Sequence, residues 1–377
     1  MPAPLKILIA PLDWGLGHTT RCIPLIRFFR QRGDRVIAAA EGASAALLRD
    51  NFNDLEILPL EGYRIRYSRS ARGFAFRIVA QVPRIFSAIR KERRWLAAQQ
   101  QAHAFDLVLS DNRYGMYHKG VPSVILTHQL QIQSGFGAWA DKILRRLHYR
   151  MLGRFSACWV VDTAAGSGLS GALAHPEALP PHAAYIGLLS QFGEHKPSSE
   201  APLPGNILVL LSGPEPMRSQ LEQLVLRQAR SLPAYRYVIV AGRPGAVPPA
   251  ALPEHITYHA HANAQALSAL LAHAALVICR SGYSTLMDLA VLKKKALLIP
   301  TPGQTEQEYL ARYLAAGGMG HSVKQEQLRL SADIPRALSG SRPLQLPDNA
   351  PTLAQVLPPL LGNLLPRRRD QEASFTR

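Results

Sequence analysis

The sequence predicts an α/β protein with two doubly wound domains of the Rossmann type. Apolar segments of strand length alternate with longer segments of helical periodicity along most of the chain. The alternation is interrupted at 187–205, where Gly, Pro and Ser cluster, and then starts again. With 377 residues, the chain is long enough for two such domains joined by a linker.

Strands of the first domain are predicted where a short apolar run leads into a polar or glycine-containing turn. These runs lie at 5–10, 35–40, 56–60, 106–110, 123–126, 157–161 and 184–186. Helices are predicted between them, where apolar residues recur with helical spacing. They lie at 19–32, 43–51, 74–101 and 138–153. Because little of the pattern is that of antiparallel hairpins, we expect a parallel sheet.

The second half repeats this order of elements. Its strands are predicted at 207–211, 237–240, 256–258, 275–278 and 296–299. Its helices are predicted at 217–232, 264–273, 284–292 and 306–316, with a last helix at 352–365. We therefore expect an N-terminal domain at 1–190, a linker at 191–205, a second domain at 206–345, a C-terminal helical segment at 346–366 and a disordered tail at 367–377.

Composition indicates an ordinary globular protein, since 47% of the residues are hydrophobic and 18% are charged. No signal peptide is predicted at the N-terminus, and no apolar run is long enough to span a bilayer. The cysteines Cys22, Cys158 and Cys279 are far apart and form no CxxC pair, which argues against a disulfide framework and a structural zinc site. We expect a cytoplasmic protein.

The formal charge of +17 is concentrated in the first half. Between 64 and 94 there are ten basic residues and one acid, Glu92, and a second basic cluster occupies 142–154. Both clusters are interleaved with aromatic and aliphatic residues, a composition typical of a helix that lies on an anionic membrane. The alternative is a solvated basic face. No nucleic-acid recognition motif accompanies the charge, so we expect no nucleic-acid partner.

The segment 275–308 carries the most specific motif. A strand ends at a Ser281-Gly282 turn, and the helix that follows offers free N–H groups and a positive dipole end to a diphosphate. Asp288, about one turn into this helix, suits ribose hydroxyls. The loop after the next strand supplies amide and carboxylate groups for sugar hydroxyls. The candidate donor residues here are Arg280, Ser281, Gly282, Ser284, Thr285, Asp288, Gln304, Gln307 and Glu308. Alternatively, Asp288 closes a capping box, or a serine caps the helix.

A second candidate loop, residues 11–21, follows the first strand. Gly15 and Gly17 let the backbone approach a ligand, and Asp13 and Trp14 lie beside them as acceptor-site candidates. His18 begins the next helix at the carboxyl edge of the sheet, where it could take a proton from an acceptor hydroxyl. Alternatively, this histidine only caps or packs. A dinucleotide site is a weaker alternative, because the third glycine of that fingerprint is missing.

Two further sets of polar residues follow predicted strands. Asp111, His128 and Gln129 end consecutive strands at the edge that carries His18, so they are acceptor-site or catalytic candidates. Asp111 either orients His18 or is itself the base, and ordinary strand-end polarity is the alternative for all three. In the second domain, the loop at 211–218 offers a hydroxyl, an N–H and a guanidinium to phosphate, or else is only a Pro-initiated helix start. Its candidates are Ser212, Gly213 and Arg218.

The segment Cys279-Arg280-Ser281-Gly282, with Asp288, Pro300 and the pair Gln307-Glu308, resembles the donor-binding half of glycosyltransferase family 28. The best-known member of that family adds N-acetylglucosamine to the lipid-linked peptidoglycan precursor. The resemblance is strongest over 270–315 and recurs in the glycine-rich loop that ends at His18. It implies the GT-B fold, in which two Rossmann-type domains face each other across a cleft and a C-terminal helix packs back on the N-terminal domain.

The resemblance also implies roles. Asp288 would hold the nucleotide ribose, Gln307 and Glu308 the donor sugar, and His18 would face the reaction centre. In the loop at 211–218 two prolines replace family glycines. No D-x-D, HExxH, GxSxG or P-loop motif occurs, so no metal or other cofactor is expected.

We therefore expect a metal-independent, inverting glycosyltransferase. Its donor would be a UDP-linked sugar, and its acceptor a lipid-linked or glycan hydroxyl of the cell envelope, reached from the inner face of an anionic membrane as a peripheral protein. The alternatives are a nucleotide-sugar 2-epimerase of the same fold and a non-catalytic partner protein with a donor-type fold.

Overall fold

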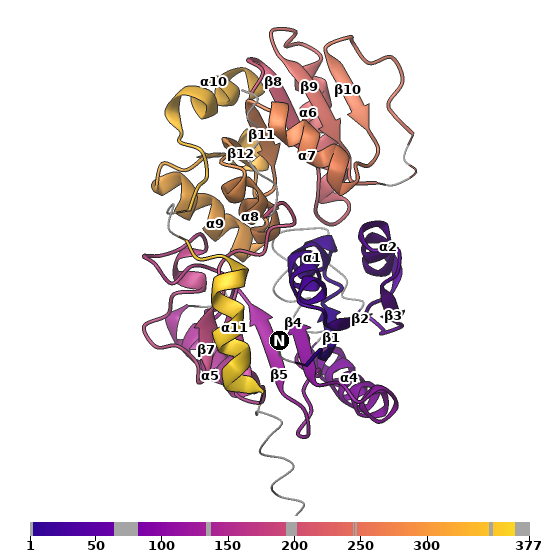
Figure 1. Cartoon of the computed structure of the whole chain (residues 1–377). Coiled ribbons are helices and arrows are strands. Elements are labelled where there is room, and N and C mark those ends of the chain that lie inside the picture. Colours follow the sequence, from indigo (N-terminus) through magenta and orange to yellow (C-terminus); the bar gives the residue numbers. More distant parts are fainter. Residues whose placement is uncertain are drawn as a thin grey trace, which may run out of the picture.

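The computed structural model describes residues 3–63, 82–132, 137–193, 202–243, 245, 247–346 and 350–365. Two parallel sheets, each flanked by helices, form an N-terminal and a C-terminal domain, drawn below and above in Figure 1. The predicted fold class, two doubly wound Rossmann-type domains, is confirmed. The basic residues predicted at 64–77 and the tail at 367–377 lie outside the described residues.

The N-terminal sheet has the strand order β3-β2-β1-β4-β5-β6-β7, and all neighbouring strands are parallel. Its strands are β1 (Lys6–Pro11), β2 (Arg35–Ala39), β3 (Glu56–Leu58), β4 (Leu107–Asp111), β5 (Ser123–Thr127), β6 (Ala157–Val160) and β7 (Ala183–Tyr185). The connecting helices are α1 (Leu16–Gln31), α2 (Gly42–Asn51), α4 (Val82–His103) and α5 (Ala138–Leu152). The central strands are buried on both faces, which explains their continuous apolar sequence.

The C-terminal sheet has the order β10-β9-β8-β11-β12-β13 and is also parallel. Its strands are β8 (Asn206–Leu210), β9 (Arg236–Val240), β10 (Ile256–His259), β11 (Leu276–Cys279), β12 (Ala296–Leu298) and β13 (His321–Ser322). Its helices are α6 (Met217–Ala229), α7 (Ala264–His273), α8 (Tyr283–Val291), α9 (Thr305–Ala316) and α10 (Leu330–Gly340).

Two elements, β13 and α10, were missing from the sequence prediction. Strand β13 has only two residues, too few for a recognisable pattern. Helix α10 buries Leu330, Ile334 and Ala337 with helical spacing, but Pro335 inside it breaks the local pattern that predicts a helix. Both elements lie within the bounds predicted for the second domain, 206–345.

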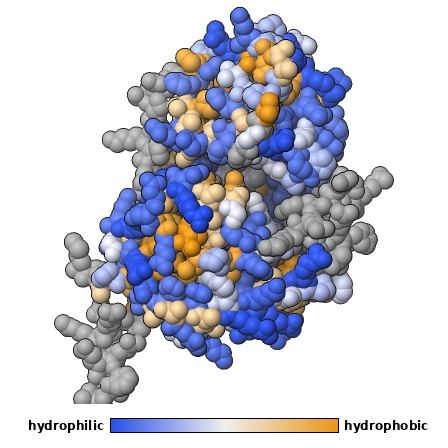
Figure 2. Space-filling view, turned by 90° about the vertical axis from the view of Figure 1, so that its right-hand side faces the viewer, coloured by the Kyte–Doolittle hydropathy of each residue, from blue (hydrophilic) through white to orange (hydrophobic). Residues whose placement is uncertain are grey.

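The last helix, α11 (Leu353–Leu364), lies against the N-terminal domain, as Figure 1 shows. Its side chains Leu357 and Leu361 are buried in a core that also contains Trp159 and Ile186 of that domain. Most of the surface in Figure 2 is hydrophilic, with an apolar area on the N-terminal domain. In the described parts of the chain, no helix is both long and apolar enough to cross a membrane.

Candidate functional site

The carboxyl edges of the two sheets meet where the first turn of α8 contacts the first turn of α1. The hydroxyl of Ser284 in the first turn of α8 donates a 2.8 Å hydrogen bond to the carbonyl of Gly17. Beside it, the Tyr283 hydroxyl donates to the carbonyl of Val161 at 2.7 Å. These contacts bring the N-terminus of the candidate donor helix to the start of α1, the helix that carries His18.

His18 and Asp111 lie together as predicted from their strand-end positions. Strands β1 and β4 pair so that Pro11 and Asp111 lie side by side, and α1 starts only a few residues after Pro11. The Nδ1 atom of His18 is 3.1 Å from Oδ2 of Asp111. The carboxylate is fully buried, whereas 16% of the His18 side chain is exposed. Asp111 is therefore placed to orient the imidazole rather than to meet a substrate, which argues against Asp111 as the base.

Arg21 completes this cluster and was not among the predicted site residues. Its Nε donates to Oδ2 of Asp111 at 2.7 Å, and its Nη2 donates to Oδ1 of the same carboxylate. Nη2 also lies 2.7 Å from Nδ1 of His18. Arg21 lies three residues after His18 on the same helix, a spacing that places both side chains on one face. An arginine inside an apolar helix segment was the signal that could have revealed it.

Charge and burial set the protonation of the cluster. Burial and the neighbouring Arg21 lower the pKa of His18, so the imidazole is neutral at neutral pH. Burial alone would raise the pKa of Asp111, but Arg21 and His18 outweigh it and the pKa is lowered. Because Nδ1 of His18 carries either a proton or a lone pair, it either donates to Asp111 or accepts from Arg21, but not both.

His128 was predicted as an acceptor-site residue, and the structure uses it differently. Its Nδ1 lies 3.1 Å from Nη1 of Arg21, and its Nε2 lies 2.9 Å from Oε1 of Glu306 at the start of α9. Its ring is stacked on Tyr283, with the centroids 4.2 Å apart. Both ring nitrogens are therefore bonded within the protein, and His128 joins the two domains. Glu306 was also absent from the predicted site.

The candidate sugar-binding loop is held by its own polar side chains. Ser281 donates to the carbonyl of Gln307 at 2.8 Å, and Oε1 of Gln307 accepts from the Thr301 N–H at 2.9 Å. Oε1 of Glu308 accepts from the Gly303 N–H at 2.9 Å. Ser281, Gln307 and Glu308 were predicted to bind the donor. In the structure, these side-chain oxygens form hydrogen bonds that hold the loop in its conformation. Other predicted donor positions, Gly282, Thr285 and Gln304, lie at the starts of α8 and α9.

Beside this loop, two buried polar atoms lack a partner. Nε of Arg280 and Oγ1 of Thr301 have no hydrogen-bond partner among the residues that the structure describes. A Cβ atom built on Gly213 would lie 3.5 Å from the Thr301 hydroxyl and 3.9 Å from Arg280 Nε. The other nitrogens of Arg280 donate to the carbonyls of Ile299, Pro300 and Met217 and to the side chain of Gln325. Burial lowers the pKa of Arg280 to about 10.

Arg218 was predicted to pair with phosphate, and its contacts do not favour that role. Its guanidinium donates to Glu215 at 2.7 Å and to Glu222 at 2.9 Å, and also to the carbonyl of Ala241 and the hydroxyl of Ser219. The side chain is 4% exposed. Arg218 thus stabilises the start of α6, while Ser212 and Gly213 before it are exposed.

Asp288 lies on α8 at the boundary between the domains. Oδ1 accepts from the hydroxyl of Ser190 at 2.7 Å, and Oδ2 accepts from the side-chain amide of Gln191 at 3.1 Å. It closes no capping box, since the N-cap of α8 is Gly282 and makes no side-chain bond. Burial raises the pKa of Asp288 to about 6.

The remaining acceptor-site candidates flank His18 on the N-terminal domain. Gly15 is the N-cap of α1, with a φ of 91°, a conformation that favours glycine. Oδ1 of Asp13 accepts from the Tyr63 N–H at 3.0 Å, and Trp14 is 36% exposed. Gln129 follows His128 and is half-buried.

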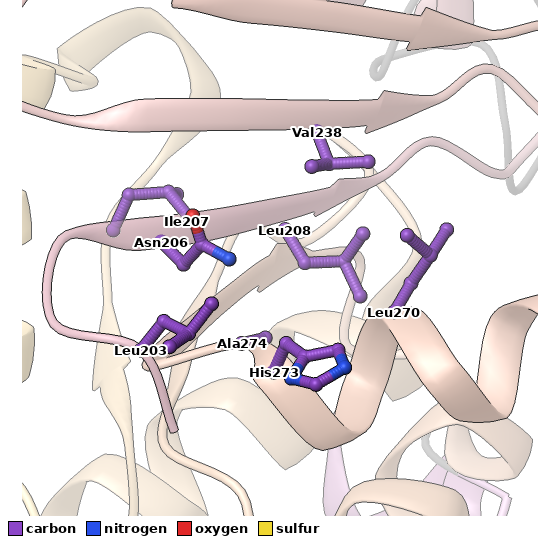
Figure 3. Close-up of a pocket in the computed structure, with 8 residues that line it drawn as sticks. All are labelled: Leu203, Asn206, Ile207, Leu208, Val238, Leu270, His273 and Ala274. Carbon is purple, nitrogen blue, oxygen red and sulfur yellow. The ribbon is translucent and has the colours of Figure 1, made fainter. Parts of the chain in front are cut away.

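A small pocket lies elsewhere in the C-terminal domain. It has a volume of about 130 Å³ and opens between α7 and the sheet, as Figure 3 shows. Asn206 and Leu208 of β8 line it together with His273 of α7. Because Asn206 begins β8, the pocket lies toward the amino edge of the sheet, away from the residues described above.

Known proteins resemble this chain in sequence and in fold. Residues 219–351 match the glycosyltransferase family 28 C-terminal domain. An uncharacterized glycosyltransferase of Methanosarcina acetivorans is 26% identical over 333 residues, which cover 84% of this chain and 83% of that protein. A UDP-N-acetylglucosamine–N-acetylmuramyl-(pentapeptide) pyrophosphoryl-undecaprenol N-acetylglucosamine transferase of Methylobacterium sp. is 30% identical over 159 residues, 38% of this chain and 40% of that one.

The fold is also shared with solved structures. Spinosyn rhamnosyltransferase SpnG complexed with thymidine diphosphate has a TM-score of 0.60 at 18% identity, and the match covers 89% of this chain and 92% of that one. Likeness at this identity concerns the fold, which is GT-B. Taken with the related sequences, it shows that the chain is a glycosyltransferase built on the GT-B fold, whose residues 219–351 resemble the C-terminal domain of glycosyltransferase family 28.

Proposed function

We propose that the protein transfers a sugar from a UDP-sugar to a hydroxyl of a membrane-bound acceptor, with inversion at the anomeric carbon and without a metal. The single observation that carries this proposal is the hydrogen bond between Ser284 and Gly17. It brings the N-terminus of α8, a site suited to a diphosphate, to the turn of α1 that presents His18.

The donor diphosphate would lie beside Gly213, between the loop after β8 and the start of α8. The unpartnered Arg280 Nε and Thr301 hydroxyl support this position, because a phosphate oxygen would satisfy both. Free N–H groups at the N-terminus of α8 would stabilise the charge that develops on the leaving diphosphate. The exposed Ser212 adds a hydroxyl at the same loop.

The nucleoside would extend along α8 toward Asp288. Its carboxylate has two partners, Ser190 and Gln191, and an ionised carboxylate can accept about four hydrogen bonds. Ribose hydroxyls would therefore add to these partners or replace them. The donor sugar would lie toward Gln304 and the loop shaped by Gln307 and Glu308. We choose uridine because the related Methylobacterium enzyme is named for a UDP-sugar.

His18 would act as the general base. In the form that works as a base, Nδ1–H donates to Asp111, so Nε2 carries the lone pair that takes the proton. The acceptor oxygen then bonds to the anomeric carbon, the bond from that carbon to the diphosphate breaks, and the proton stays on His18. A pKa lowered by burial and Arg21 keeps the free imidazole unprotonated, as a base must be.

A membrane-bound acceptor is supported by an exposed face of α5. Trp139, Ile143 and Leu147 follow one another at helical spacing and are 78%, 41% and 52% exposed. Lys142, Arg145 and Arg146 of the same helix line a pocket of about 430 Å³ with Tyr149 and Glu177. Apolar side chains beside basic ones suit an interfacial helix on anionic lipid.

The proposal is tested by incubating the protein with single UDP-sugars and following products by NMR. We expect slow release of UDP and a free sugar whose first-formed anomer is inverted relative to the donor, and we expect His18→Ala to lose this activity. An epimerised sugar nucleotide formed from the donor alone would instead identify the epimerase alternative. No product with any UDP-sugar, with or without a membrane lipid extract, would contradict the proposal.

A further inference from the structure

The contact between His128 and Glu306 fixes a proton position. Arginine can only donate hydrogen bonds, so Nη1 of Arg21 requires a lone pair on Nδ1 of His128. The ring proton must then sit on Nε2, where it is donated to Oε1 of Glu306 at 2.9 Å. Stacking on Tyr283 holds the ring in the plane that serves both bonds.

This contact crosses the boundary between the domains. His128 follows β5 of the N-terminal domain, whereas Glu306 and Tyr283 belong to α9 and α8 of the C-terminal domain. The His128 side chain is 6% exposed and that of Glu306 is 22% exposed. Burial opposes ionisation of Glu306, but the hydrogen bond with His128 and the positive charge of Arg21 outweigh it and lower its pKa. Glu306 is therefore a carboxylate at neutral pH.

Arg21 carries the effect of this contact to His18. One end of its guanidinium lies against His128, and the other lies 2.7 Å from Nδ1 of His18. There it competes with Asp111, which lies 3.1 Å from the same atom. The position of Arg21 thus decides whether Nδ1 of His18 donates to Asp111 or accepts from Arg21.

We propose that Glu306 is a positioning residue that, through His128 and Arg21, couples the docking of the donor domain to the tautomer of His18. When the domains are in contact, Glu306 holds the His128 tautomer that accepts from Arg21, and this anchors the guanidinium. Without Glu306, His128 is free to carry its proton on Nδ1, and Arg21 loses this contact while it keeps its ion pair with Asp111. The role of His18 as the general base rests on the proposed function. The tautomers of His128 and His18 do not, because they can be measured in the free protein.

The test is NMR of protein labelled with ¹⁵N-histidine, because one-bond and two-bond couplings distinguish the two tautomers. Signals are assigned by their loss in His128→Gln and His18→Gln. In the wild type we expect His128 as the Nε2–H tautomer. Glu306→Ala should change the signals of both His128 and His18, whereas Glu306→Gln, which keeps an acceptor oxygen, should leave both tautomers as in the wild type. Glu254→Gln removes the same charge at an exposed position and is the matched control.

A wild-type His128 with its proton on Nδ1 would overturn the proposal. Unchanged His18 signals in Glu306→Ala would overturn it as well, and so would Glu306→Gln spectra that match those of Glu306→Ala. Once a donor sugar is known, Glu306→Ala should change kcat with the donor KM unchanged, since only the tautomer and geometry of the base are altered. Calorimetry with UDP on the same samples distinguishes a failure of this proposal from a failure of the proposed function. Absent UDP binding would count against the proposed function alone.

Discussion

Gly17 and Ser284 are in contact so close that no side chain fits between them. A Cβ atom on Gly17 would lie 2.8 Å from the Ser284 hydroxyl oxygen and 3.2 Å from its Cβ. The glycine is therefore explained by the approach of α8, since its own φ is not among the positive values. The two domains meet at this point.

Gly17→Ala should weaken the domain contact. The new methyl group displaces the Ser284 hydroxyl from the Gly17 carbonyl, and we expect a loss of about 1–2 kcal/mol in the free energy of unfolding. Ser284→Gly removes both the obstructing atoms and the hydrogen bond, so Gly17→Ala should cost much less in the Ser284→Gly background than in the wild type. Urea unfolding of the four proteins in this cycle measures the coupling. Strictly additive effects would show that the two residues are not in contact.

Asp111→Asn should destabilise the protein strongly. The substitution leaves the guanidinium of Arg21 buried without its carboxylate, which costs about 3–5 kcal/mol in unfolding free energy. Asp54→Asn is the matched control, because Asp54 also pairs with an arginine but is 72% exposed. We expect the control to change stability far less, because an exposed ion pair is screened by water. Equal effects of the two variants would contradict the buried ion pair.

The buried carboxylates make opposite contributions to the dependence of stability on pH. The pKa of Asp111 is lowered in the folded state. Its stabilisation of the fold is therefore present when the pH lies above the ordinary pKa of aspartate, and is lost as the pH falls through the pKa of Asp111 in the folded state. The pKa of Asp288 is raised from 3.8 to about 6, so its contribution is present below pH about 4 and is lost as the pH rises through about 6.

Asp288→Asn should therefore remove part of this pH dependence. Between pH 4 and 6.5 the free energy of unfolding should decrease less in the variant than in the wild type. The difference between the two decreases should be about 2–3 kcal/mol. Urea unfolding at intervals of half a pH unit measures it. Parallel curves for the two proteins would show that the Asp288 carboxyl is not buried as described.

Thr301→Val should separate stability from ligand binding. The variant removes a buried hydroxyl that has no partner among the described residues, so the free protein should gain about 1 kcal/mol of stability. If that hydroxyl meets a diphosphate, affinity for UDP should fall about 10- to 100-fold. Thr257→Val, on the exposed side of β10, is the control for both measurements. A variant that binds UDP as tightly as the wild type would remove Thr301 from the donor site.

The apolar residues on α5 should be needed for membrane binding and not for folding. The triple variant Trp139→Ser/Ile143→Ser/Leu147→Ser should keep the wild-type melting temperature, because these side chains are exposed. Its sedimentation with vesicles of anionic phosphatidylglycerol should fall at least about tenfold, since each apolar side chain contributes roughly 1.5–3 kcal/mol when buried in lipid. Val247→Ser, at an 87% exposed position, is the control. Wild-type protein that does not bind such vesicles would contradict this part of the account.

The fold could be predicted because buried parallel strands have continuous apolar sequences, and all the longer strands were recognised in this way. Helix α10 escaped, since Pro335 interrupts its pattern. The edge of the sheet that carries His18 and Asp111 could also be predicted, because parallel strands end at one edge.

Other parts of the site depend on contacts between distant segments, which a local pattern does not contain. Glu306 looks like an ordinary charged helix residue in the sequence, and only the meeting of the two domains brings it to His128. Arg21 reaches His128 from a different element of the same domain. Likewise, Arg218 follows a loop suited to phosphate, but its neighbours Glu215 and Glu222 take its guanidinium. A side chain that could bind a ligand is therefore not enough to predict a binding site, because neighbouring groups of the protein can take it instead.

The most direct test of the central claim is calorimetric titration with UDP, GDP, dTDP, ADP and NAD. We predict that UDP binds preferentially and that Asp288→Ala and Thr301→Val each weaken its binding, because these are the positions proposed for the ribose and the diphosphate. Binding of NAD alone, with no nucleoside diphosphate bound, would contradict the account and favour a dinucleotide enzyme.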